Sequence, residues 1–127
     1  MECRGRTILF ALMHHPVNVG RGLSVMQLSR IGPFALEEPL GGHESNVIRG
    51  VHVELKRSMA IKLLPRRIVD QALGRSPFAD DVKRMQKLQH PHVVQTYGGA
   101  VQDGQPYLAL EYVPGESLRA RLDRRGR

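Results

Sequence analysis

A lysine interrupts an otherwise apolar run at residues 59–64 (MAIKLL), and Pro65 ends that run. A short apolar run bounded by a polar turn and a proline is typical of a buried strand. Lysine is among the residues least often fully buried unless another group pairs with it. Lys62 therefore either points to solvent from an edge strand or reaches an anion, and these two alternatives imply different folds and functions.

The composition indicates one small folded domain with a cationic surface. The chain has 127 residues, of which 41% are hydrophobic, enough for a single core. Nineteen Lys and Arg against twelve Asp and Glu give a net charge of +7, which favours polyanionic partners such as nucleotides, nucleic acid or anionic membranes. Five arginines fall in the last ten residues. A solvated helix face explains this cluster, and because the sequence shows no aromatic stacking array, a nucleic-acid partner is not expected.

Several other classes of protein are not expected. The single cysteine, Cys3, cannot form an internal disulfide, which fits a cytoplasmic location. No run approaches the roughly 18 apolar residues of a membrane span. Residues 7–13 (TILFALM) imitate a signal peptide weakly but are followed by no small-residue cleavage site. The histidines of the segment 90–92 (HPH) have no carboxylate or cysteine at a suitable spacing, so no metal site is predicted.

The first half of the chain predicts an irregular leader and three strands. Residues 1–29 show no period, and we expect a poorly ordered leader there and one domain over residues 30–127. Strands are expected at 34–40, 47–55 and 59–64. In the second of these, alternation should place Val47, Val51, Val53 and Leu55 on one side.

The second half predicts a helix, two strands and the start of a further helix. Ser76 and Pro77 are typical of a helix start, and Phe78, Val82, Met85 and Leu88 form its apolar stripe. Strands are expected at 93–97 and 107–113, joined by a loop that contains Gly98 and Gly99. The fold class is therefore α+β, a five-stranded antiparallel sheet with one main helix, and Ser117 should cap a second helix.

This order of elements, together with the string MAIK at 59–62, resembles the amino-terminal lobe of bacterial-type Ser/Thr protein kinases from about Ile31 to the end of the chain. The family has V-A-I-K on its third strand. Ala60 and Lys62 share one face of a strand because side chains alternate. The resemblance implies that Ala60 lines the adenine slot and that Lys62 reaches the α- and β-phosphates of ATP.

Residues 40–48 (LGGHESNVI) stand where the family has its glycine-rich loop, G-x-G-x-x-G-x-V. The resemblance assigns Leu40, Gly41 and Ile48 to the ATP site, with Ile48 as the apolar residue that covers adenine. His43 replaces the second glycine and Asn46 the third. Glycines let the backbone N–H groups approach the phosphates, and side chains obstruct that approach, so these two departures leave ATP binding open.

The predicted helix should supply an acidic partner for Lys62. Counting back from His90 and Pro91, which resemble a conserved motif of the family, places Asp81 at the position of the glutamate that pairs with the lysine. Asp81 is one methylene shorter than glutamate. In the alternative interpretation, Asp80 and Asp81 only complement the positive end of the helix.

Residues 107–115 (YLALEYVPG) resemble the last strand of the lobe and the hinge that follows it. The resemblance makes Leu110 the gatekeeper and assigns the main chain of Glu111 and Val113 to the edge of adenine. It places Ser117 near the ribose.

Neither the catalytic H-R-D string nor the metal-binding D-F-G string occurs in the chain. We therefore expect no catalytic residue and no Mg²⁺ ligand in these residues, although the family uses both ATP and Mg²⁺. The predicted function is a partial Ser/Thr protein kinase domain that supplies the ATP-binding half of a phosphotransferase site. The expected partners are a nucleotide and a protein substrate or partner lobe. The alternative is a non-catalytic lobe that binds a nucleotide or a protein.

Overall fold

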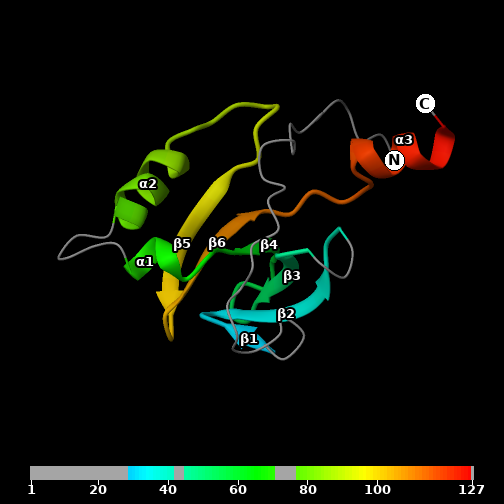
Figure 1. Cartoon of the computed structure of the whole chain (residues 1–127). Helices are drawn as coiled ribbons and strands as arrows, with labels where there is room; N and C mark the ends of the chain where they lie inside the picture. The colour runs from blue at the N-terminus through cyan, green and yellow to red at the C-terminus, as the bar shows by residue number, and fades with distance from the viewer. Residues whose placement is uncertain (1–28, 42–44, 71–76, 127) are drawn as a thin grey trace.

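The computed structural model describes residues 29–41, 45–70 and 77–126, and its main feature is a six-stranded antiparallel sheet (Figure 1). The strands are β1 (Arg30–Ile31), β2 (Phe34–Pro39), β3 (Val47–His52), β4 (Ser58–Leu63), β5 (Thr96–Gln102) and β6 (Gln105–Glu111). Their spatial order is β1-β2-β3-β4-β6-β5. The helices are α1 (Arg67–Asp70), α2 (Pro77–Gln86) and α3 (Leu118–Arg125). The predicted α+β class is confirmed.

The predicted number of strands is one too low. Five strands were expected, and the sixth is β1, a pair of residues that lies antiparallel to β2. Two residues are too short to show alternation in the sequence. The predicted leader at residues 1–29 lies outside the described residues except for Ser29.

The sheet separates two groups of buried side chains. One face, here called the helix face, carries buried residues of the sheet together with two residues of α2; these are Val47, Ala60, Leu108, Leu110, Phe78 and Val82. The other, here called the opposite face, carries a second cluster: Ile31, Phe34, Ile48, Met59, Ile61, Leu63, Tyr107 and Ala109. The strands of the sheet centre are therefore covered on both sides, which explains their nearly continuous apolar sequences.

The strand β5 begins later and runs further than predicted, passing through both glycines that were expected in a loop. A Cβ atom on Gly99 would lie 2.9 Å from the Tyr107 carbonyl oxygen and 2.9 Å from Cγ2 of Val82. Glycine at this position lets α2 lie directly against β5 (Figure 1). The hairpin closes at Asp103 and Gly104, which both have positive φ, as a two-residue turn requires. Consequently β6 begins at Gln105, before the predicted start at Tyr107.

The strand β3 ends at His52 rather than at Leu55. Residues 53–55 form a turn, Lys56 has a φ of 55°, and Leu55 is 61% exposed. The predicted alternation through Val53 and Leu55 is therefore wrong, because a turn follows where the pattern suggested continued strand.

The main helix starts at Pro77 as predicted and ends at Gln86. Phe78 and Val82 are buried, whereas Leu88 lies beyond the helix and is 60% exposed, so it does not belong to the apolar stripe. The proposed cap Ser76 lies outside the described residues.

The second predicted helix is α3, and its cap is confirmed. The Ser117 hydroxyl accepts a hydrogen bond from the Ala120 N–H at 3.1 Å. Figure 1 shows α3 standing apart from the sheet, and none of its residues is buried. In the described part of the chain, no helix has the length and apolar character needed to cross a membrane.

Candidate functional site

Lys62 lies on β4, an interior strand between β3 and β6, which excludes the edge-strand alternative. Its neighbours across the sheet are Val47 on β3 and Leu108 on β6. The residue is only 6% exposed, and burial lowers the pKa of its ammonium group. Among the described residues no ion pair of Lys62 is formed. Within residues 29–41, 45–70 and 77–126, Lys62 is thus a cationic side chain in an apolar surrounding without a compensating acid.

An apolar surface lies next to this cation on the helix face. Ala60 is two residues before Lys62 on the same strand and is 6% exposed, and Leu110 lies opposite it on β6. Val47 completes the surface from β3. Two residues along a strand span about 7 Å. The helix face therefore carries apolar side chains and one cationic side chain about that far apart along β4.

The hairpin between β2 and β3 borders the site at Lys62. The Leu40 N–H donates to the Val47 carbonyl at 2.8 Å, and the Leu40 side chain packs against the helix-face core. Gly41 has a φ of 94°, a conformation that favours glycine. Residues 42–44, including His43, lie outside the described residues. Asn46 does not have a positive φ, and its side-chain amide instead donates to the Leu63 carbonyl at 3.2 Å.

The structure places Ile48 on the opposite face, where it packs with Ile61, its partner across β3 and β4. It therefore does not lie beside Ala60 and Lys62 as the alignment with the glycine-rich loop implied. Val47 occupies that face instead. Counting from Gly41 along the family's loop pattern assigns the apolar position over adenine to Ile48, whereas the pairing of β3 with β4 puts Val47 on the face of Lys62. Only the register of β3 against β4 could have identified Val47.

Asp81 is on the exposed side of α2, and its carboxylate contacts the Arg84 guanidinium at 3.5 Å. The structure does not bring it into an ion pair with Lys62. Pairing between Asp81 and Lys62 therefore stays a prediction.

The hinge segment, defined here as residues 111–115, follows Leu110 at the end of β6. The Glu111 N–H donates to the Gln95 carbonyl at 2.8 Å, and its carboxylate accepts from the Gln95 N–H at 3.2 Å. Val113 is half-buried, and Ser117 is exposed and caps α3. The contacts of these residues with adenine and ribose stay predictions.

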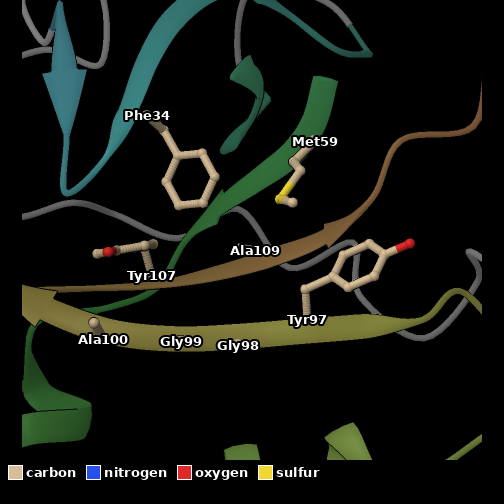
Figure 2. A pocket seen from close by; sticks show the side chains of 8 residues that line it. All are labelled: Phe34, Met59, Tyr97, Gly98, Gly99, Ala100, Tyr107 and Ala109. Carbon is tan, nitrogen blue, oxygen red and sulfur yellow. The ribbon is translucent and has the colours of Figure 1, made fainter. Parts of the chain in front are cut away.

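A cleft of about 230 Å³ lies on the opposite face and is separate from this site. Figure 2 shows its lining, which contains aromatic, methionine and small residues and no charged side chain: Phe34, Met59, Tyr97, Gly98, Gly99, Ala100, Tyr107 and Ala109. Burial raises the pKa of the Tyr107 hydroxyl there. The residues that line the cleft are uncharged, and the cleft lies on the opposite face of β4 from Lys62, so it is not the site that the buried lysine indicates.

The fold and the site together define a small α+β lobe in which a buried lysine lies beside apolar side chains on an interior strand. A comparison with protein families identifies the class directly: the protein kinase domain model matches residues 34–127. The match begins at the first residue of β2 and includes every described element except β1. The chain therefore belongs to the protein kinase domain family and contains part of such a domain.

Proposed function

We propose that this chain supplies the ATP-binding half of a bacterial-type Ser/Thr protein kinase site and that residues 1–127 alone do not transfer phosphate. One observation carries the proposal. Lys62 is buried on an interior strand, next to Ala60 on the helix face, and has no acidic partner among the described residues. A buried charge without a partner costs free energy, and a bound anion offsets that cost.

The geometry supports a specific division of roles. Val47, Ala60 and Leu110 provide the apolar wall for adenine, with Leu40 at its border. Lys62 contacts the α- and β-phosphates as a compact point charge. Gly41 lets the main chain turn toward the phosphates. The main-chain groups of Glu111 and Val113 bond the edge of the base, and Ser117 lies near the ribose.

The charge of Lys62 depends on the ligand in this proposal. Burial lowers the pKa of Lys62 in the free protein, whereas adjacent phosphate oxygens favour the charged form. Pairing of Asp81 with the same ammonium group is part of this proposal, and it requires α2 to move inward and Asp81 to leave the Arg84 guanidinium. Mg²⁺ serves the family by stabilising the transferring phosphoryl group, and the described residues contain no cluster of side chains that could hold a metal ion.

A second candidate function is a non-catalytic lobe that binds a nucleotide or a protein partner. Neither H-R-D nor D-F-G occurs in the 127 residues, and Asn46 uses its side chain to hold β4. On α3, Leu118 and Leu122 are 60% and 41% exposed. Exposed apolar side chains on α3 favour an interaction in which another protein surface, such as a partner lobe, covers this helix.

Calorimetry with ATP tests the proposal, with Lys62→Met as the variant and Lys87→Met as the matched control, since Lys87 is exposed. We expect binding heat at up to millimolar ATP for the wild type and Lys87→Met, and none for Lys62→Met. A phosphoryl-transfer assay on residues 1–127 should show no product. The absence of heat in the wild type would contradict the nucleotide proposal and leave the protein-binding alternative.

A further inference from the structure

Arg49 forms a group of contacts beside the proposed nucleotide site. It lies on β3 directly opposite Ala60, and therefore on the helix face. Its Nε lies 3.4 Å from the carboxylate of Glu37, and its Nη1 donates to the carboxylate of Glu38 at 3.1 Å. Its Nη2 donates to the Ser58 hydroxyl at 3.2 Å. One guanidinium thus connects β3 to both neighbouring strands, β2 and β4.

The same guanidinium also contacts the hinge segment. Its central carbon is 5.2 Å from the centre of the Tyr112 ring, a distance typical of cation–π contact. Tyr112 is the first residue after β6 and stands between Glu111 and Val113. Arginine suits this position better than lysine because its planar group can stack on a ring while its N–H groups donate in the plane.

Arg49 is not available as a phosphate ligand. The carboxylates of Glu37 and Glu38 already balance the charge of Arg49. The ion pair between Arg49 and Glu38 is retained at neutral pH. A main-chain hydrogen bond and then the hydrogen bond from Arg49 lower the pKa of the Glu38 carboxyl. Its contacts are instead directed at β2, β4 and Tyr112, which lie next to Ala60 or follow Leu110 and Glu111 in the chain.

We propose that Arg49 is a positioning residue that fixes the hinge segment relative to Ala60 and thereby sets the affinity of the site for the base. This inference rests on the proposed function. Hydrogen bonds to the base edge need donors and acceptors held at about 2.9 Å, so the main chain of Glu111 and Val113 must keep a fixed distance from the wall that Ala60 forms. The Arg49–Tyr112 contact supplies that constraint from β3.

The experiment compares Arg49→Ala and Arg49→Lys with a matched control, Arg57→Ala. Arg57 also stacks on a tyrosine, with its guanidinium carbon 5.6 Å from the centre of the Tyr97 ring, in the cleft lining. Two quantities are measured: amide hydrogen exchange at Tyr112 and Val113, and binding of adenosine and of ATP by calorimetry. A cooperative thermal transition establishes that each variant is folded.

We expect Arg49→Ala to accelerate exchange at Tyr112 and Val113 about fivefold, corresponding to the loss of one exposed cation–π contact. Arg49→Ala should also weaken the binding of adenosine and the binding of ATP by the same factor. Arg49→Lys should recover part of both effects, and Arg57→Ala should change neither.

Two results would overturn the inference: unchanged exchange in Arg49→Ala, or a loss of ATP affinity with adenosine affinity retained. The latter would make Arg49 a phosphate ligand. If the wild-type chain bound neither ligand, the proposed function would fail. Accelerated exchange in Arg49→Ala would then show that Arg49 orders the hinge, and the statement about base affinity would be wrong.

Discussion

Val47 and Lys62 lie directly opposite each other on β3 and β4, with their side chains on the helix face of the sheet. The Leu40–Val47 main-chain hydrogen bond closes the preceding hairpin at the same level. Leu40, the residue before Gly41, therefore lies at the same level of the sheet as the lysine. This pairing makes Val47, rather than Ile48, the apolar residue next to the candidate phosphate site.

Replacing Lys62 by methionine should stabilise the folded chain. The ammonium group is buried without an ion pair among the described residues, and methionine fills similar space without the cost of burying a charge. The free energy of unfolding should rise by roughly 1 kcal/mol. Urea denaturation at pH 7 measures it, and a clear loss of stability would show that Lys62 has a stabilising partner.

The stability advantage of Lys62→Met should shrink as the pH rises. Burial lowers the pKa of Lys62 in the folded state, so between the folded and unfolded values the unfolded chain binds more protons. Wild-type stability therefore rises with pH relative to the variant, up to the ordinary lysine value of about 10.4. Urea denaturation of both proteins between pH 7 and pH 10 tests this. A constant difference would mean that Lys62 is not desolvated.

Gly99→Ala should destabilise the fold by about 1–3 kcal/mol, because the added methyl group overlaps the Tyr107 carbonyl oxygen and Val82. Gly98→Ala is the matched control, since the nearest atom, Nε2 of Gln86, would lie 3.9 Å away. We expect that change to stay within about 0.5 kcal/mol. Equal effects of the two substitutions on the midpoint of thermal unfolding would contradict the close contact between α2 and β5.

Two substitutions in β3 distinguish the two faces of the sheet. Val47→Ala should weaken ATP binding about threefold to tenfold, because it removes apolar contact with the base. Ile48→Val should cost about 1 kcal/mol of stability, since Ile48 is only 2% exposed, and leave ATP affinity unchanged. If calorimetry showed weaker ATP binding for Ile48→Val and unchanged binding for Val47→Ala, Ile48 would be the residue next to the base, as the glycine-rich loop pattern implied.

The sequence predicted the features that depend on local pattern. The buried strand around Lys62, the start of α2 at Pro77 and the cap at Ser117 follow from residue type and spacing, and the structure agrees. It failed where a distant contact decides the outcome. Gly99 is in a strand because it pairs with Leu108 on β6, its lack of a side chain leaves room for Val82 of α2, and β1 exists only as a partner of β2.

For the candidate site too, the sequence predicted what depends on local pattern and not what depends on strand register or on distant contacts. Period-two alternation places Ala60 and Lys62 on one face, which the structure confirms, because Ala60 belongs to the same buried cluster as Val47 and Leu108, the cross-strand partners of Lys62. The choice between Val47 and Ile48 depends on the register between two strands, and a shift of one residue exchanges the faces. The contacts of Arg49 with Tyr112 connect segments far apart in the chain, and no local pattern signals them.

The most direct test of the central claim is a two-dimensional NMR titration of the ¹⁵N-labelled chain with ATP. If Lys62 marks a nucleotide site on the helix face, the amide signals of Val47, Lys62 and Leu110 should shift together with one dissociation constant. The signals of Tyr97 and Ala100, in the cleft on the opposite face, should stay in place. Shifts confined to the cleft, or no shifts at millimolar ATP, would contradict the claim.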